Sequence, residues 1–268
     1  MGYNTKIDWC DSSWNPVTGC YHDCEYCYAR GIAKRYGGYN IDPVGESVTI
    51  RTFSGQKIVE LDNQVNRVYK NHAVRIAPYP YGFTPTLHRY RLDQPMAWTQ
   101  PRTIFVCSMA DLFGEWVPDG WIEEVFKACE AAPQHRYLFL TKNPSRYESV
   151  LNSPMPDNMW FGWSQEGPTG NKAAFHTDAD VLVNTFVSIE PLLRPFEEFC
   201  IKNIGWAIVG AETGNRKNKV IPEKKWVMDI AEACEQAGVP LFMKESLRKI
   251  MGDDFRQEFP WGGDANER

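Results

Sequence analysis

Three cysteines lie within eight residues in a C-x3-C-x2-C spacing, as Cys20, Cys24 and Cys27. Thiolates are the ligands of iron–sulfur clusters, so three of them on one short loop can bind three corners of a [4Fe-4S] cube. The fourth iron then has no protein ligand within the motif, and an open coordination position is what a catalytic metal needs. The spacing therefore predicts a [4Fe-4S] cluster on this loop.

Two other uses of these cysteines stay open. A zinc site would have to be completed by Cys10 or His22. Structural zinc usually comes with a second C-x2-C or H-x3-H pair, and the sequence contains none. A disulfide framework fits less well, because three clustered cysteines cannot all pair with one another.

The elements that position this loop are expected from the pattern of apolar residues. Short apolar runs alternate with helical stretches from residue 103 onward, as is typical of strands buried on both faces. One helix is expected to start near Pro118. Another is expected to start near Pro222 and stop at Gly238, with an inward face made of Val227, Ile230, Cys234 and Ala237. The runs are 103–108, 136–141, 159–164, 185–190, 205–211 and 240–244.

Strand alternating with helix indicates βαβ units and a parallel sheet. With one further strand near the N-terminus, the pattern predicts an α/β fold, a partial or complete (β/α) barrel forming a single domain over residues 1–268. Active groups of such TIM-type barrels lie at the carboxyl ends of the strands. The expected strands all end in polar residues, which favours a catalytic mouth, although any one strand end can be polar.

Tyr26 stands before the last cysteine, and the resulting C-x3-C-x-(aromatic)-C pattern resembles the signature of the radical S-adenosylmethionine (SAM) superfamily. The resemblance implies a partial (β/α)6 barrel with SAM bound at the open iron through its amino and carboxylate groups. It implies that one electron from the reduced cluster cleaves SAM to methionine and a 5′-deoxyadenosyl radical, which abstracts a substrate hydrogen. A reductase with flavodoxin, or a ferredoxin, is the implied electron donor.

A closer resemblance covers most of the chain and is to a three-cysteine family of bacteriophages and prophages whose reaction is unassigned. It rests on the segments IDW, WNPVTGC, SMADLF, LTK, SIEPLL and VGAETG. The chain departs from that family in three ways. Relatives usually have a longer gap between the first two cysteines, often a polar residue at Cys107, and often threonine at Cys10.

The superfamily resemblance also suggests which residues hold SAM. Tyr26 is expected near the adenine or the cluster. The Gly-Gly-Glu run with which members often hold the SAM amino group is absent here. Ser108 and Asp111 occupy the equivalent strand end and could accept the ammonium through charge-assisted hydrogen bonds.

Later strand ends supply four more candidates for SAM or substrate. Glu190 and Glu212 could bind the ribose hydroxyls or the substrate, and Lys244 the SAM carboxylate or a substrate phosphate. Gly210, beside Glu212, would let the backbone approach the nucleoside closely. A capping role or a supporting hydrogen bond is the alternative for each of these residues.

Cys107 is a candidate catalytic residue at the same barrel mouth. A thiol pointing inward could donate a hydrogen atom to a substrate radical, whereas an outward thiol would be part of the core, the commoner fate of cysteine. Cys129 and Cys234 lie on apolar helix faces and are expected to be structural. Cys10 and Cys200 receive no role.

Residues 38–102 break the strand–helix alternation and are expected to form a Pro- and Tyr-rich insertion or lid. From residue 63 to 102 the segment carries six basic residues against one acidic residue, Asp93, which gives a local charge of +5. Basic residues interleaved with aromatics can follow a phosphate backbone and stack bases. The predicted nucleic-acid contacts are Arg75, Arg89, Tyr90 and Arg91. The alternative is an ordered lid packed by its own tyrosines and prolines.

Composition limits the class of protein. The chain has 268 residues, of which 43% are hydrophobic and 24% charged, as in ordinary globular proteins. The mean hydropathy is −0.45 and no apolar run approaches 18 residues, so no membrane span is expected. The N-terminus has no apolar signal region, and unpaired thiols with an oxygen-labile cluster fit a cytoplasmic location.

The leading hypothesis is a radical SAM enzyme that modifies or repairs a base of a nucleic acid or nucleotide. A second hypothesis keeps the radical chemistry but takes a peptide or small metabolite as substrate. A third is a non-catalytic nucleic-acid-binding protein stabilised by a metal. The net charge of −5 weakens the third, because such a binder normally carries an unopposed basic face.

Overall fold

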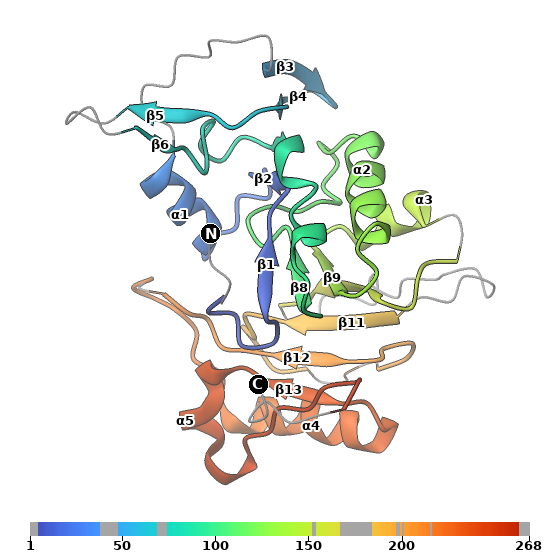
Figure 1. The fold of residues 1–268 in the computed structure, drawn as a ribbon. Coiled ribbons are helices and arrows are strands. Elements are labelled where there is room, and N and C mark those ends of the chain that lie inside the picture. Colours follow the sequence, from blue (N-terminus) through green and yellow to red (C-terminus); the bar gives the residue numbers. More distant parts are fainter. Residues whose placement is uncertain are drawn as a thin grey trace. The chain divides into compact units, whose positions relative to one another are not determined.

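The computed structural model describes residues 5–37, 48–68, 74–151, 154–166, 184–196, 199, 201–214 and 216–262. The chain divides into two compact units. The expectation of a single barrel domain over residues 1–268 stays a prediction. The first unit is Ser12–Phe139, and the second combines Thr5–Asp11 with Leu140–Arg268. Both units contain parallel strands and helices, so the fold is α/β (Figure 1).

Parallel strands and one helix form the centre of the first unit. Strand β8 (Thr103–Val106) is buried along its whole length and pairs in parallel with β1 (Ser12–Trp14) and with β9 (Arg136–Thr141). Helix α2 (Asp119–Glu130) follows Pro118, as predicted, and buries Ile122, Val125 and Cys129 among other residues. This apolar side provides the helix with its main stabilisation, because burial of such side chains contributes about 1.5–3 kcal/mol each.

The predicted insertion forms small sheets of its own within the first unit. One sheet has the strand order β2-β7-β4-β3, in which the insertion pairs with the short strand just before the cysteine loop. A separate ribbon pairs β5 with β6. The elements are β2 (Val17–Thr18), β3 (Val48–Phe53), β4 (Gln56–Leu61), β5 (Asn66–Val68), β6 (Val74–Ile76), β7 (Thr86–His88), helix α1 (Tyr28–Tyr36) and the 3₁₀ turns Arg89–Arg91 and Pro95–Ala97.

The second unit contains a parallel sheet with the order β10-β11-β12-β13 and the helix α4 (Lys224–Ala237). Buried side chains of α4 and of the last three strands form one apolar cluster. The remaining elements are β10 (Met159–Ser164), β11 (Asn184–Ile189), β12 (Ala207–Val209), β13 (Leu241–Met243), α3 (Tyr147–Val150), α5 (Arg248–Met251) and the 3₁₀ turns Pro144–Arg146, Glu245–Leu247 and Gly252–Asp254.

Helix α4 matches the predicted helix at its carboxyl end. Gly238 caps it in the left-handed conformation, with φ of 66°, as a glycine there should. Val227, Ile230 and Cys234 are buried as expected, but Ala237 is exposed, so its predicted inward position is wrong. No helix in the described part of the chain is long and apolar enough to cross a membrane.

Candidate functional site

The cysteine loop starts at a glycine that the surrounding backbone leaves no room to replace. Gly19 has φ of +87°, and a Cβ there would lie 2.4 Å from the carbonyl oxygen of Thr84. Its N–H donates to the carbonyl of Met109 at 2.8 Å, and the N–H of Cys20 donates to that of Phe83 at 3.2 Å. The first cysteine is therefore held between the segment after β8 and the segment before β7.

Backbone N–H groups point at two of the three thiols. The N–H of His22 donates to Cys20 Sγ at 3.5 Å, and the N–H of Arg30 donates to Cys27 Sγ at 3.4 Å. Cys27 is the N-cap residue of α1, so its side chain lies at the amino end of this helix. Cys27 N–H also bonds to the carbonyl of Cys24 at 3.2 Å, which closes the loop into a turn.

The protein environment keeps the first thiol protonated. Burial raises the pKa of Cys20 to about 12, and the hydrogen bond from the His22 N–H opposes this only in part. The neighbouring charges of Asp111, Cys24 and Cys27 raise the pKa further. The negative charges of neighbouring groups thus disfavour the Cys20 thiolate, and a positively charged centre bound at this thiol would favour it.

Asp111 anchors the loop through a histidine. Its Oδ2 lies 2.7 Å from His22 Nε2, and its Oδ1 accepts a hydrogen bond from the N–H of Phe113 at 3.0 Å. Asp111 is 5% exposed, and the His22 ring packs edge-on against Trp116 at 4.9 Å between centroids. Both carboxylate oxygens thus accept bonds from the protein. The contact partner of Asp111 is His22, which sequence reasoning considered only as a zinc ligand.

The predicted SAM-binding residue Ser108 lies in the same region of the first unit. Its hydroxyl donates to Asn15 Oδ1 at 3.2 Å, and the same oxygen accepts the N–H of Met109 at 2.9 Å. The Tyr28 hydroxyl donates to the Ser108 carbonyl at 2.6 Å. Asn15 was missed at the sequence level, although it belongs to the WNPVTGC segment. Tyr26, also predicted to contact SAM, is half-buried.

Cys107 is a buried thiol at the end of β8. It is 2% exposed and has φ of 59°, so its backbone departs from the extended conformation expected over residues 103–108. Burial raises the pKa of this thiol to about 12, while a hydrogen bond with the Val17 backbone lowers it. Its position matches the core-thiol alternative, and its role as a hydrogen-atom donor stays a prediction. Cys10, Cys129 and Cys234 are also buried, and Cys200 lies outside the described residues.

Two of the predicted residues of the second unit form an ion pair. Lys244 Nζ contacts Glu190 Oε1. The side chain of Lys244 is 15% exposed and that of Glu190 is 25% exposed. The lysine chain lies across Gly210, where a Cβ would come within 2.8 Å of Lys244 Cδ. Gly210 therefore gives space to a side chain of this protein, where the prediction gave it to a nucleoside.

Glu212 organises the loop that follows β12. Arg216 donates to both of its carboxylate oxygens at 2.7 Å, and the N–H of Val220 donates to Oε2 at 3.3 Å. The hydrogen bonds from Arg216 hold the pKa of Glu212 below its usual value against the opposing effect of burial. These contacts agree with the supporting role named as the alternative, and binding of ribose or substrate by Glu212 stays a prediction.

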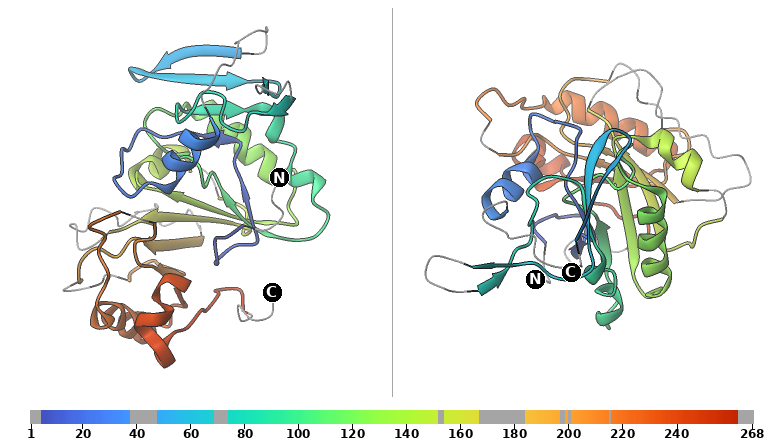
Figure 2. Two further views of the ribbon diagram at one scale, coloured as in Figure 1. Left: turned by 90° about the vertical axis from the view of Figure 1, so that its left-hand side faces the viewer. Right: turned by 90° about the horizontal axis from the view of Figure 1, so that it is seen from above.

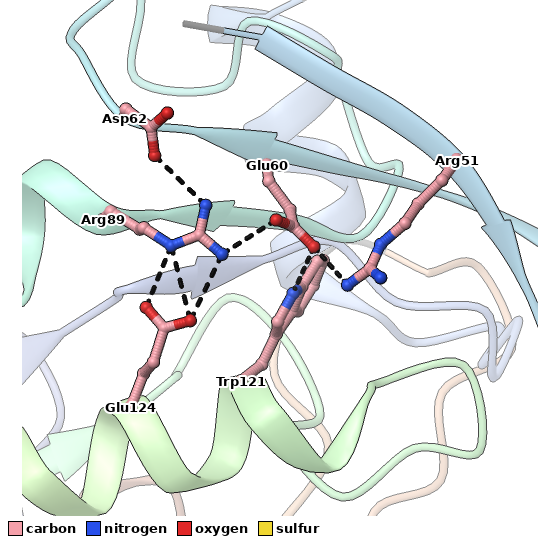
Figure 3. A network of polar contacts seen from close by, with 6 residues as sticks. All are labelled: Arg51, Glu60, Asp62, Arg89, Trp121 and Glu124. Atoms are coloured by element: carbon pink, nitrogen blue, oxygen red, sulfur yellow. Dashed lines mark hydrogen bonds and ion pairs between the residues drawn. The ribbon is translucent and has the colours of Figure 1, made fainter.

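Arg89, a predicted nucleic-acid contact, lies at the centre of a network of charged side chains (Figure 3). It donates to Glu60 at 2.8 Å, to Asp62 at 3.1 Å and to Glu124 at 3.0 Å. Glu60 also accepts the indole N–H of Trp121 at 2.9 Å and contacts Arg51. The network joins the insertion to helix α2 within the first unit.

Arg91, Tyr90 and Arg75 occupy different settings. Arg91 is 7% exposed and donates to the carbonyls of Asn15 and Pro78 at 3.0 and 2.8 Å. Its guanidinium also lies over the ring of Tyr90, 5.3 Å from the centroid. Arg75 is exposed on β6. Arg89 and Arg91 therefore both contact other groups of the protein. The prediction that these residues bind nucleic acid stays a prediction.

The loop has the donor set of an iron–sulfur cluster. Among the residues that the structure describes, no group of three or more His, Cys, Asp or Glu side chains could hold a metal ion as arranged. A zinc ion needs its ligand atoms gathered about 2.0–2.3 Å from one centre. A cubane cluster instead takes each thiolate at a different iron. Cys20, Cys24 and Cys27 lie on one short loop, with backbone donors to the sulfurs of Cys20 and Cys27, and fit that requirement chemically.

Fold and site together define an α/β protein whose first unit carries a three-thiol loop beside the segment after a buried parallel strand. A family model described as "Protein of unknown function (DUF5131)" matches residues 4–248, so the chain belongs to this family. No curated protein and no solved structure matches the sequence.

Proposed function

We propose that this protein is a radical SAM enzyme that acts on a nucleic acid or nucleotide. The observation that carries the proposal is the loop with Cys20, Cys24 and Cys27. The first and last of these sulfurs accept backbone hydrogen bonds, and Cys27 caps a helix. A [4Fe-4S] cluster bound there would supply the single electron that cleaves SAM to methionine and a 5′-deoxyadenosyl radical. The partial (β/α)6 barrel belongs to the same proposal.

The residues around the loop have supporting tasks in this proposal. Asp111 and His22 fix the conformation of the loop between the first two cysteines. Asn15 fixes Ser108, whose hydroxyl is the first-unit candidate for the SAM amino group. Glu190 and Lys244 remain candidates for SAM or substrate in the second unit.

Cluster content tests the proposal. Protein purified without oxygen should be brown and contain about four iron and four sulfide per chain, as a [4Fe-4S] cluster requires. Cys20→Ala, Cys24→Ala and Cys27→Ala should each lose this content. Cys234→Ala, the same change at a buried thiol outside the loop, should keep it. Colourless protein with stoichiometric zinc, or iron retained in all three loop variants, would refute the proposal.

A further inference from the structure

Helix α1 directly follows the last cysteine of the loop and buries one narrow side. Its buried residues are Ala29 and Ala33, which are four residues apart and therefore lie on the same side of the helix. This side packs in a small apolar cluster with Met109, and the partly buried Tyr79 and Phe83 pack against the same cluster. Two alanines thus attach the helix to the rest of the first unit.

The opposite side of α1 is exposed. Tyr28, Gly31 and Arg35 follow one another at spacings of three and four residues, Lys34 lies beside Gly31, and all four are exposed. A Cβ on Gly31 would meet no atom within 4 Å, so the space over the middle of the helix is open. The helix lies at the outside of the first unit (Figures 1 and 2). A large partner can therefore reach this side, which we call the α1 face.

The α1 face is basic. Helix α1 contains no acidic residue. Arg30 is paired with Asp23 at 3.2 Å, but among the residues that the structure describes neither Lys34 nor Arg35 has an ion-pair partner. Two positive charges of the α1 face are thus left for a partner to neutralise.

The α1 face also presents an aromatic ring in a fixed position. Tyr28 is 54% exposed, yet its hydroxyl donates to the carbonyl of Ser108 at 2.6 Å. Tyrosine and arginine are enriched among the residues that contribute most to protein interfaces, and a side chain already held in place loses less entropy on binding. The combination of Tyr28 with Arg35 suits a protein partner.

The position of the α1 face relative to the cysteine loop indicates which protein this is. Lys34 is seven residues beyond Cys27, or about 10 Å along the helix axis. The proposed reaction consumes one electron for each SAM cleaved, so a reductant must come close to the cluster. The chain has a net charge of −5, which repels an acidic carrier, and a local basic surface would orient such a carrier at the loop.

We propose that the α1 face docks an acidic one-electron carrier protein, with Lys34 and Arg35 opposite carboxylates of the carrier. This inference rests on the proposed function and names the partner that supplies its electron. The reduced carrier loses one electron and is oxidised, the cluster gains that electron, and no atom is transferred. Complexes of electron carriers bury little surface and are transient, so a short helix beside the loop provides sufficient area.

Charge reversal on α1 tests this proposal. Lys34→Glu/Arg35→Glu is compared with the control Lys202→Glu/Lys249→Glu, which makes the same change in net charge at exposed positions of the second unit. The probes are a bacterial flavodoxin and a bacterial ferredoxin, both acidic. Binding of each carrier to the full-length proteins is measured by biolayer interferometry across a salt series. The rate at which each reduced carrier bleaches the cluster is measured without oxygen.

Wild type and control should bind at least one carrier, and the α1 variant should bind it at least about tenfold more weakly at low salt. The difference should shrink as salt rises, because screening weakens the attraction between exposed charges. Reduction of the cluster by the carrier should slow by a similar factor. Reduction by dithionite, a small molecule that needs no docking surface, should change little.

Gly31→Gln provides a second variant that keeps the net charge. Glutamine favours a helix more than glycine does, and the open space over Gly31 accepts its side chain in the free protein. The longer side chain should obstruct the carrier and weaken binding in the same direction as charge reversal. A loss of affinity in this variant therefore does not come from misfolding.

Three results would overturn the proposal. They are equal carrier affinities of the α1 variant and the control, no binding of either carrier by wild type, and an α1 variant that loses affinity for nucleic acid but not for the carriers. Wild type that binds the carrier through α1 but forms no 5′-deoxyadenosine with dithionite would refute the proposed function and leave the docking proposal standing. Wild type that cleaves SAM with dithionite, with carrier-driven reduction independent of Lys34 and Arg35, would refute the docking proposal alone.

Discussion

Single side chains connect parts of the first unit that are far apart in the sequence. His22 and Asp111 are 89 residues apart, and Glu60 and Trp121 are 61 residues apart. In each pair a buried carboxylate accepts bonds from more than one donor. Removal of such an acceptor leaves buried donors unsatisfied, which costs more than a typical hydrogen bond contributes.

Asp111→Ala should lower the free energy of unfolding by about 1–3 kcal/mol, because His22 and the Phe113 N–H both lose their acceptor. Asp111→Asn retains one acceptor oxygen and should lose less. Urea unfolding of the three proteins, monitored by tryptophan fluorescence, provides the comparison. Equal stability of Asp111→Ala and wild type would show that the carboxylate does not anchor the loop.

Glu60→Gln should lower the free energy of unfolding by about 1–3 kcal/mol, because Arg51, Arg89 and the Trp121 indole lose a charged acceptor while the arginines stay partly solvated. The Glu60 side chain is only 10% exposed and faces Arg51 and Arg89. The matched control is Glu123→Gln, which removes an exposed ion pair with a 4.0 Å separation and should change stability by less than about 1 kcal/mol.

The Glu60 effect should also depend on pH. Burial raises the pKa of this carboxyl, but hydrogen bonds from Trp121 and Arg89 and the charge of Arg51 outweigh burial and leave the pKa below its usual value. Its stabilisation is therefore full above the usual pKa and is lost as pH falls through the lowered native pKa. The difference between wild type and Glu60→Gln should shrink in acid, and a constant difference would contradict this assignment.

At the scale of elements, two glycines test how the cysteine loop and its helix are built. Gly19→Ala should destabilise the protein and displace the loop, because φ is +87° and backbone atoms of Thr84 occupy the Cβ position. Gly31→Ala, inside α1 with open space around it, should stabilise the protein by about 0.5–1 kcal/mol. Thermal unfolding of both variants checks this, and effects of the same sign would contradict it.

Strand β7 should make the stability of the protein pH-dependent through His88. Burial lowers the pKa of this imidazole well below its usual value, and the charge of Arg91 lowers it further. The unfolded chain therefore takes up the proton first, so stability should fall as pH drops below about 6.5. His88→Asn, measured by urea unfolding between pH 7.5 and 5, should show a shallower decline. Parallel curves for the two proteins would be inconsistent with a neutral buried His88.

Many elements were predictable from the sequence for a definite physical reason. The apolar runs 136–141 and 159–164 coincide with β9 and β10. Strands buried on both faces form nearly continuous apolar runs, so the ends of the run mark the ends of the strand. Proline before α2 and glycine after α4 fixed their ends. The sheet of β2, β7, β4 and β3 was not predicted, since its strands are short and its pairings connect distant segments.

The three thiols of the site were predictable because their spacing is local. The partners of Asp111, Arg89 and Cys107 were not, because they depend on tertiary contacts. Cys107 adopts a left-handed backbone conformation, which strand alternation cannot anticipate. At strand ends the sequence indicated where charged residues gather but not that Glu190 pairs with Lys244, or Glu212 with Arg216.

At the scale of the whole molecule, the chain is an α/β protein of two compact units in the DUF5131 family, with the three-thiol loop in the first unit. Candidate SAM residues occur in both units. The net charge of −5 is the sum of a basic segment, residues 63–102, and an acidic remainder of the chain. Within that segment, the exposed Arg75 lies on β6.

Product analysis of SAM tests the central claim most directly. Cluster-loaded protein, dithionite and SAM are incubated without oxygen, and 5′-deoxyadenosine and methionine are quantified by chromatography. Cys27→Ala provides the matched negative control, because it removes one predicted ligand at the start of α1. We expect both products from wild type and neither from the variant. Wild-type protein that carries a reduced cluster and leaves SAM intact would contradict the assignment as a radical SAM enzyme.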